Sequence, residues 1–423
     1  MTEREPAELA TGLEAASGPA PRSLYVHVPF CVSLCPYCDF VVYTGRSTRG
    51  PRSRIDAFVG ALSQELELRA DIVDARFGAL GSVARRPLDT LYFGGGTPSL
   101  LPPASIAALV QVVRERFGLA TEAEVTLEAN PGPDDRGDAT GFADAGVTRL
   151  SLGAQSFQDE ELRTLGRRHR GAHVADAVLA ARSARIASIN IDLLYDVPGQ
   201  TLASWTDSLE RALALAPDHL SLYALTLDDP DAEGLTGELG DHLPTRSGAR
   251  RWRAASRRRQ DDERATAMYH HATALLAGEG WRAYEISNWA RRGHESRHNL
   301  AYWWRQPYEA VGPGAHAFDG TRRRWNAARL EGYLAALQPP DGSKPILPPG
   351  SSETVDASTA AAESMILGLR LDTGVPAELM AEPALTDAFA WAKSLGFLLV
   401  DGSRVRLTTR GRLFSNELFA RLI

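Results

Sequence analysis

The sequence predicts an α/β fold, namely a partial (β/α)6 TIM-like barrel followed by a small C-terminal α+β domain. Between residues 23 and 227, short apolar segments alternate with helix-like segments, which is the pattern of parallel βα units with right-handed crossovers. Beyond residue 357, helix-like segments accompany one hairpin pattern, as in a small winged-helix-like module. A length of 423 residues is sufficient for one large domain and one smaller one.

Six segments are predicted strands because they are short, apolar and followed by polar or glycine-rich turns. Several are nearly continuous apolar runs, which predicts burial on both faces of a parallel sheet. The predicted strands are 23–28, 89–94, 124–129, 149–154, 188–195 and 219–227. Helix-like segments lie between them, among them 54–73, 103–118 and 172–184.

Composition shifts along the chain predict its division into parts. The first residues are rich in Ala, Pro, Glu and Gly and predict a disordered tail, whereas a Pro/Gly/Ser stretch near residue 340 predicts a linker. A hairpin is expected to turn at Asp401-Gly402. The predicted parts are a tail (1–22), the barrel with a C-terminal extension (23–337), a linker (338–356) and the C-terminal domain (357–423).

Two regions of the barrel part stand apart from the βα units. Residues 244–260 form a basic insertion with seven arginines and Trp252. The insertion is predicted to be a solvated, flexible loop, with a docking site for an acidic partner as the alternative. Residues 282–318 are rich in aromatic side chains and end in glycine-rich turns.

Charge and composition exclude some functions. The chain has 46 basic and 53 acidic residues, a net charge of −7, which gives no support to nucleic-acid binding. No apolar run reaches the length of about 18 residues that a membrane span requires. The N-terminus lacks the apolar core of a secretory signal, and three closely spaced thiols indicate a reducing, cytoplasmic setting.

All three cysteines of the chain, Cys31, Cys35 and Cys38, lie within eight positions in a C-x3-C-x2-C pattern. A structural zinc ion takes four ligands, and only His27 or Asp39 could complete such a set locally. A [4Fe–4S] cluster normally takes four thiolates. Three thiolates would leave one iron open to bind a substrate or cofactor directly, so this cluster is preferred over zinc.

With Tyr37 before the last cysteine, this pattern resembles the signature of the radical S-adenosylmethionine (SAM) superfamily. The wider string Y-x-H-x-P-F-C-x3-C-x-Y-C-x-F resembles the group of oxygen-independent coproporphyrinogen III dehydrogenases and their relatives. The resemblance implies a radical SAM barrel in which the open iron is chelated by the amino and carboxylate groups of SAM. The implied cluster ligands are Cys31, Cys35 and Cys38.

Polar and glycine residues follow the predicted strands at the ends where barrels bind ligands. The string FGGGTPS, from Phe93 to Ser99, lets the backbone approach a ligand closely, although it is not a dinucleotide motif. Arg167 has the planar donors that pair with a carboxylate. The resemblance implies SAM contacts from Tyr25, Tyr37, Gly95, Gly96, Thr97, Glu128, Gln155, Arg167, Asp192 and Thr226. Asp196 departs from the family pattern, in which glycine is usual, and is expected to alter a turn.

Two branches of this family share these features, the dehydrogenases and the heme chaperones of the HemW type. The dehydrogenases carry a fourth cysteine at the position of Phe40, whereas the resemblance to the chaperones extends over nearly all of residues 22–423. The chaperones hold heme with an H-N-x-x-Y-W string, which implies heme contacts from His298, Asn299, Tyr302 and Trp303. A neutral imidazole is a suitable axial ligand for heme iron. A buried histidine in an aromatic core is the alternative for His298, and His316, His270 and His271 are alternative ligands.

The favoured function is therefore a heme-binding chaperone that carries a [4Fe–4S] cluster and SAM and transfers heme to apoproteins. The alternative is an oxygen-independent coproporphyrinogen III dehydrogenase, and a zinc-stabilised scaffold is the third reading. Enzymatic activity is left undecided, with dehydrogenase activity disfavoured. The expected partners are heme-accepting apoproteins, with respiratory heme proteins as candidates, and an electron donor. No nucleic acid and no membrane span are expected, and peripheral membrane contact is left open.

Overall fold

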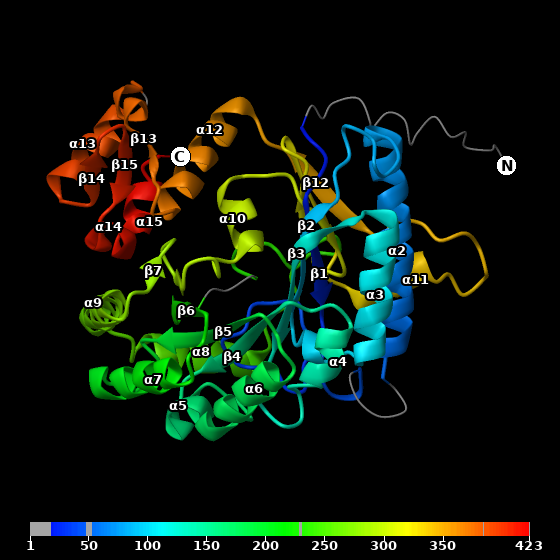
Figure 1. Ribbon diagram of the computed structural model, residues 1–423, viewed down its shortest axis with the longest axis horizontal. Coiled ribbons are helices and arrows are strands. Elements are labelled where there is room, and N and C mark those ends of the chain that lie inside the picture. Colours follow the sequence, from blue (N-terminus) through cyan, green and yellow to red (C-terminus); the bar gives the residue numbers. More distant parts are fainter. Residues whose placement is uncertain (1–17, 48–52, 228–230, 384, 423) are drawn as a thin grey trace.

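The computed structural model describes residues 18–47, 53–227, 231–383 and 385–422, and its largest element is a nine-stranded sheet (Figure 1). The strand order is β7-β8-β6-β5-β4-β3-β2-β1-β9, so the sheet is open between its two edge strands. The six predicted strands are parallel neighbours in sequence order, which confirms the partial barrel. They are β1 (Ser23–Val28), β2 (Leu88–Gly95), β3 (Leu119–Ala129), β4 (Arg149–Gln155), β5 (Ser188–Tyr195) and β6 (His219–Ala224).

Three short strands extend this sheet beyond the predicted units. On one edge β9 pairs parallel with β1, and on the other β8 and β7 follow β6 in antiparallel pairing. Because they come from the aromatic-rich region after the barrel units, that region is part of the sheet and not an appendage. The bounds are β7 (Arg282–Ala283), β8 (Asn288–Ala290) and β9 (Glu309–Val311).

Helices connect the parallel strands and cover the outer face of the sheet (Figure 1). Leu91 and Phe93 of β2 are fully buried in one core with Leu62 and Leu109 from the covering helices. Burying one such side chain contributes about 1.5–3 kcal/mol. The helices are α2 (Ile55–Phe77), α3 (Pro103–Arg116), α4 (Ala139–Asp144), α5 (Asp159–Thr164), α6 (Gly171–Ser183), α7 (Leu202–Ala214) and α9 (Asp262–Gly278), with 3-10 turns η1 (Gly45–Ser47) and η3 (Pro98–Leu100).

The inner face of the sheet is polar. Thr90, Thr126, Ser151, Asn190 and Ser221 are buried at alternate strand positions, between apolar residues of the outer core. Successive side chains of a strand point to opposite faces, so each strand presents its apolar residues to the helices and its polar residues to the barrel interior. Both faces of the sheet are buried, as predicted, but the inner face is polar because it lines a cavity.

The basic insertion 244–260 is not the solvated loop that the sequence predicts. Most of it forms α8 (Ser247–Arg257), and Arg253 on this helix is buried. Alanine and arginine favour helix, and this helix is fixed by Trp252, which packs against a small apolar cluster, and by the buried Arg253. The low apolar content of the segment therefore gives the wrong prediction.

A second, three-stranded sheet follows the barrel and corrects the predicted linker 338–356. Its last strand, β12, belongs to that segment and pairs with β11 through Trp325 and Ser351. Backbone pairing along a polar strand needs no apolar pattern, so composition alone does not reveal it. The elements are α10 (Arg297–Trp303), β10 (His316–Phe318), β11 (Arg322–Asn326), α11 (Leu330–Leu337) and β12 (Gly350–Thr354).

The C-terminal part forms a small α+β domain with a core of its own, which includes Phe389, Val405 and Leu418. The predicted hairpin is present, but it turns at Gly402-Ser403, one residue later than predicted, because Asp401 is still paired with Arg404. The domain contacts the barrel, since Asp372 N donates to Tyr284 O at 3.0 Å. Its elements are α12 (Ala357–Arg370), β13 (Val375–Pro376), η4 (Ala377–Ala381), α13 (Thr386–Ser394), β14 (Leu398–Asp401), β15 (Arg404–Leu407), α14 (Thr409–Leu413) and α15 (Ser415–Phe419).

Two predictions concern the chain as a whole. Of the predicted tail 1–22, residues 1–17 lie outside the described residues, and the remainder leads into β1. Among the helices in the described part of the chain, none combines the length and the apolar character needed to cross a membrane.

Candidate functional site

A cavity of about 650 Å³ lies at the C-terminal ends of the parallel strands and continues into the barrel interior. It extends from the cysteine loop to the C-terminal domain, so its walls come from both ends of the chain. Nearly all residues that the family resemblance assigns to the cluster and to SAM line it. These are Cys31, Cys35, Cys38, Tyr37, Gly95, Gly96, Thr97, Glu128, Gln155, Arg167, Asp192 and Thr226.

The cysteine loop leaves β1 and is held against the end of β2 by backbone hydrogen bonds. Gly96 N donates to Val28 O at 2.9 Å, and Thr97 N donates to Phe30 O at 2.8 Å. A Cβ atom on Gly96 would lie 2.7 Å from Phe30 O, so this close approach requires glycine. Cys31 Sγ lies 3.3 Å from Thr97 Oγ1, which draws the first thiol towards the glycine-rich turn.

The three thiols border the same cavity and influence one another. Burial and, to a smaller extent, the Cys35 thiol raise the pKa of Cys31 to about 12. Burial, together with the thiols of Cys31 and Cys35, also raises the pKa of Cys38. The thiols of Cys31 and Cys38 are therefore protonated in the protein alone, and metal binding has to displace these protons.

This donor set suits an iron–sulfur cluster. Three cysteines outside any disulfide reach the cavity from one loop, and thiolates are the usual ligands of such clusters. As the side chains stand in the described residues, no three His, Cys, Asp or Glu groups are gathered to hold a metal ion. The fit therefore rests on the chemistry of the thiols and on their shared cavity.

Helix α8 holds the cysteine loop from the side opposite β2. Arg253 Nε donates to Pro36 O at 3.0 Å, and its Nη2 donates to Cys38 O at 2.8 Å. The preceding residue of the helix, Trp252, lies against Tyr37 with 6.4 Å between ring centroids, and its indole donates to Thr164 O at 3.1 Å. The basic segment 244–260 thus fixes the backbone between the second and third thiols.

Glu128 at the end of β3 is the acidic group nearest the glycine-rich turn. Gly95 N donates to its Oε2 at 3.0 Å, and the Tyr92 hydroxyl donates to its Oε1 at 2.7 Å. Burial raises the pKa of Glu128 to about 7, although these two donors oppose the rise. A ligand that carries a positive charge would favour the ionised carboxylate.

Arg167 crosses the cavity wall to the cysteine loop. Its Nη2 donates to Gly153 O at 2.7 Å and to the side chain of Asn130, and its Nη1 lies 3.7 Å from Cys35 Sγ. Gln155, which ends β4, has φ of 67°, a left-handed conformation that turns the chain at the cavity edge.

Asp192 lies deeper in the barrel, on β5. Asn190 Nδ2 donates to its Oδ1 at 2.6 Å, and Ser151 Oγ donates to its Oδ2 at 3.3 Å. Burial raises the pKa of Asp192, and these donors oppose the rise. Tyr25 differs from the other predicted SAM residues because it does not line this cavity. Its hydroxyl lies 3.1 Å from His27 Nδ1, beside a smaller cavity.

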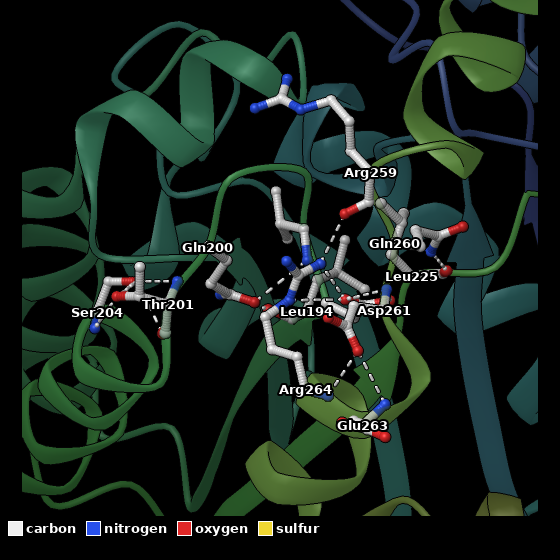
Figure 2. A network of polar contacts seen from close by, with 12 residues as sticks. Leu194, Gln200, Thr201, Ser204, Leu225, Arg259, Gln260, Asp261, Glu263 and Arg264 are labelled. Carbon is white, nitrogen blue, oxygen red and sulfur yellow. Dashed lines mark hydrogen bonds and ion pairs between the residues drawn. The ribbon is translucent and has the colours of Figure 1, made fainter.

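The departure at Asp196 has a structural explanation. Asp196 has φ of 59°, a conformation that favours glycine, and its carboxylate accepts hydrogen bonds from Arg264 and from Asp261 N. Figure 2 shows the contacts around this turn, in which Gln260 donates to Leu225 O at 2.6 Å. The acidic side chain thus anchors the turn to the first residues of α9 and its N-cap.

The predicted heme residues lie on α10, which lies between β2 and α12. His298 is 1 % exposed, with Nδ1 2.7 Å from Thr90 Oγ1 and Nε2 2.8 Å from the Tyr302 hydroxyl. Burial lowers the pKa of His298 to about 3, so the imidazole is neutral. Asn299 lines the cavity, whereas Trp303 lies under the Arg370 guanidinium at 4.4 Å.

The alternative histidines are also engaged. His316 Nε2 lies 2.7 Å from Asp241 Oδ2 beside the smaller cavity, and His271 Nε2 lies 3.0 Å from Thr206 Oγ1. His270 is exposed on α9. The members of the H-N-x-x-Y-W string thus differ in their surroundings. His298 is buried, Tyr302 lines the smaller cavity, Asn299 lines the large one, and Trp303 stacks with Arg370.

Family models and curated relatives agree on the family of this chain. The model of the radical SAM superfamily matches residues 25–212, and the HemN C-terminal domain model matches 355–414. The heme chaperone HemW of Mycobacterium tuberculosis (strain ATCC 25618 / H37Rv) is 35% identical over 410 residues, 95% of each chain. The chain belongs to the HemW family of radical SAM proteins.

Other relatives support this HemW assignment. The heme chaperone HemW of Synechocystis sp. is 34% identical and covers 84% of this chain and 79% of its own. The solved structure of coproporphyrinogen III oxidase (HemN) from Escherichia coli, a radical SAM enzyme, matches 99% of this chain and 93% of its own with a TM-score of 0.75. At 22% identity, that likeness shows the shared fold.

Sequence reasoning missed three residues of this HemW site. Tyr92 and Asn130 position Glu128 and Arg167, and Arg253 holds the cysteine loop. Asn130 follows Glu128 by two positions at the end of β3, so its place could have been inferred from the strand. Nothing in the local sequence of Arg253 marks it, because its partners lie 215 or more positions away.

Proposed function

We propose that this protein holds a [4Fe–4S] cluster through Cys31, Cys35 and Cys38 and binds SAM beside it. The observation that carries the proposal is the single cavity, in which three thiols face a ring of polar side chains at successive strand ends. When bound, the cluster would supply an electron to SAM. Arg167 would pair with the SAM carboxylate, and Glu128 or Asp192 would accept from its ammonium or ribose hydroxyls.

The full set of proposed SAM contacts comprises Tyr25, Tyr37, Gly95, Gly96, Thr97, Glu128, Gln155, Arg167, Asp192 and Thr226. Tyr25 is the exception in geometry, since it would act from behind the glycine-rich turn: a Cβ on Gly94 would lie 2.9 Å from its ring. Tyr25 would therefore shape the turn more than touch the ligand.

The working function that we propose is that of a heme chaperone, which binds heme and transfers it to apoproteins. The family membership supports this, because relatives 30–35% identical over most of the chain carry the name heme chaperone HemW. Heme would contact His298, Asn299, Tyr302 and Trp303. Ligation of iron by His298 Nε2 requires the Tyr302 hydroxyl, 2.8 Å away, to turn aside.

The proposed setting follows from the same chemistry. Unpaired thiols and an oxygen-sensitive cluster suit the reducing cytoplasm. The proposed partners are heme-accepting apoproteins, with respiratory heme proteins as candidates, and an electron donor for the cluster. Contact with a membrane surface is not part of the proposal.

A second candidate function, oxidative decarboxylation of coproporphyrinogen III, is favoured by one observation. The cavity continues from the thiols past Asp192 to Tyr223 and the C-terminal domain, so a second molecule could lie next to SAM. A radical enzyme needs its substrate in that position. Phe40, at the mouth of the cavity, occupies the place of the fourth cysteine that the resemblance assigns to the dehydrogenases.

One sample of anaerobically reconstituted protein separates these functions. We expect stoichiometric heme retention, transfer of the heme to an apoprotein, and no protoporphyrinogen formation from coproporphyrinogen III with SAM and reductant. Formation of methionine and 5′-deoxyadenosine coupled to two decarboxylations would show instead that the protein is a coproporphyrinogen III dehydrogenase. Absence of iron and sulfide from the reconstituted protein would contradict both.

A further inference from the structure

Two arginines of the C-terminal domain, Arg370 and Arg412, border the cavity at the end opposite the cysteine loop. Arg370 ends α12, and Arg412 lies on α14. Neither belongs to the residues proposed above for the cluster, SAM or heme. Asn299 of α10 and Asn416 of α15 line the same end, and both carry amide groups that can donate hydrogen bonds.

The charge of these two guanidinium groups is only partly neutralised. Among the described residues, Glu285 is the sole carboxylate in an ion pair with either, and its Oε2 lies 3.7 Å from Arg370 Nη2. Arg412 donates to two carbonyl oxygens, those of Glu285 at 3.4 Å and Ala283 at 3.5 Å, and its side chain also contacts that of Tyr269. One fully buried carboxylate therefore serves two cations, which leaves a positive charge in excess at this end.

The carboxylate of Glu285 is shared, since its Oε2 faces Arg370 at 3.7 Å without a hydrogen bond to any described residue. Its Oε1 accepts hydrogen bonds from Ser287 N at 3.0 Å and from the Asn288 side chain. Arg370 Nε is buried and forms no hydrogen bond with any described residue.

Arg370 is also held in place. Its guanidinium lies over the Trp303 ring at 4.4 Å, and Trp303 is fixed on α10. A stacked, preorganised guanidinium loses little freedom when it pairs with a carboxylate. Trp303 of the H-N-x-x-Y-W string thus supports the cationic end of the cavity from below.

We propose that Arg370 and Arg412 bind the propionate carboxylates of a tetrapyrrole, which orients the ring within the cavity with its acidic edge at the C-terminal domain. This inference rests on the proposed heme-binding function and adds the place and orientation of the ligand. Two adjacent cations match the paired propionates on one edge of heme. The C-terminal domain is then part of the binding site.

The carboxylate of SAM is the other source of the same chemistry. Arg167 lies beside Cys35 at the opposite end of the cavity, and is the cation that the proposal above assigns to SAM. A SAM carboxylate and a tetrapyrrole propionate predict different effects of substituting the two arginines. A tetrapyrrole partner predicts that Arg370 and Arg412 affect heme and leave SAM binding unchanged.

The test compares hemin with hemin dimethyl ester, whose propionates carry no charge, by absorbance titration of the reconstituted protein. We expect the wild type to bind hemin at least about tenfold more tightly than the ester, as for hydrogen bonds to charged groups. Arg370→Gln and Arg412→Gln should each weaken hemin binding and leave ester binding unchanged. Arg406→Gln, on the exposed hairpin and paired with Asp401 at 3.2 Å, is the control.

The ester comparison on the wild type needs no variant, so it stands even if Arg370→Gln disturbs the fold around Glu285. Equal affinity of the wild type for hemin and its ester would overturn the inference and leave the chaperone function intact. Loss of SAM affinity in either variant, with hemin binding retained, would assign the arginines to SAM and overturn it as well. If neither porphyrin binds to the wild type, the proposed function itself fails.

Discussion

The cysteine loop and α10 carry the two motifs that the sequence marks most clearly, yet they have opposite environments. The three cysteines are partly exposed and border the large cavity, and none forms a disulfide. His298 on α10 is buried, and both of its ring nitrogens are hydrogen-bonded. One motif is open to a ligand as it stands, whereas the other is closed by its own neighbours.

This difference teaches that a motif does not have one function for all its residues. His298 is buried and hydrogen-bonded to Thr90 and Tyr302, as in a packed core, and Tyr302 also borders the smaller cavity. Asn299 faces the cavity, and Trp303 supports Arg370. The H-N-x-x-Y-W string thus joins a structural contact to a binding surface, and variants of its members should separate the two.

The largest effect is expected from substitution of a cysteine in the cysteine loop. Cys35→Ala removes one of three thiolates, and two thiolates cannot hold the proposed cluster. We expect iron and acid-labile sulfide to fall to near zero after anaerobic reconstitution. Ser33→Ala in the same loop changes a cavity residue without removing a ligand and should retain the metal. Wild-type iron content in Cys35→Ala would contradict the proposed ligation of the cluster by Cys35.

Substitution of His298 on α10 should lower the stability of the folded protein. His298→Ala leaves a cavity and removes the partner of Thr90 and Tyr302, so we expect the free energy of unfolding to fall by about 2–4 kcal/mol. Urea denaturation measures this, and His294→Ala, at a partly exposed site, is the matched control. We also expect weaker heme binding with the cluster retained. Unchanged stability together with unchanged heme affinity would contradict both interpretations of His298.

Tyr302→Phe sharpens this test. The substitution removes the hydroxyl next to His298 Nε2 and keeps the aromatic ring. If Nε2 ligates heme iron, heme affinity should be retained or increased, because the competing contact is absent. A loss of heme affinity in the stable Tyr302→Phe protein would instead indicate that the hydroxyl itself holds the ligand. Titration with hemin distinguishes the two results.

A smaller effect is expected at the clamp on the cysteine loop. Arg253→Gln removes charged donors from Pro36 O and Cys38 O, so the loop should hold the cluster less firmly. We expect cluster formation but a several-fold faster loss of iron to a chelator. Arg251→Gln, on the exposed side of α8, should behave as the wild type. Equal rates in all three proteins would show that α8 does not act on the loop.

The smallest expected effect concerns pH. Burial raises the pKa of Glu128 from 4.5 to about 7, so between these values the folded protein keeps a proton that the unfolded chain has lost. Glu128 therefore lowers stability as the pH rises through this range. Its ability to accept from the SAM ammonium increases as the pH passes about 7, and SAM affinity should rise with it. Glu128→Gln should remove that part of the pH dependence in calorimetric titrations.

The sequence was sufficient for the features that depend on local order. The six parallel strands, the cysteine loop and the polar strand ends follow from the alternation of strand, turn and helix, and even Asp196 was marked as a departure. The polar inner face was missed because apolar residues dominate each strand segment. Only their alternation with Thr90, Ser151 and Asn190 reveals that one face lines a cavity.

What could not be predicted depends on contacts between distant parts of the chain. The Thr90–His298 contact joins residues 208 positions apart, and the Arg253–Pro36 contact joins residues 217 apart. A basic segment gives no sign that one of its arginines will be buried against a loop. The position of Arg370 depends likewise on how the C-terminal domain docks on the barrel.

The most direct test is low-temperature EPR of the anaerobically reconstituted, dithionite-reduced protein, recorded with and without SAM. The account predicts the signal of a reduced [4Fe–4S] cluster whose g-values shift when SAM is added, because SAM would bind the iron that lacks a cysteine. A silent spectrum, with no cluster detected by Mössbauer spectroscopy, would contradict the account at its centre. A cluster signal that SAM leaves unchanged would contradict the binding of SAM to an iron that lacks a cysteine ligand.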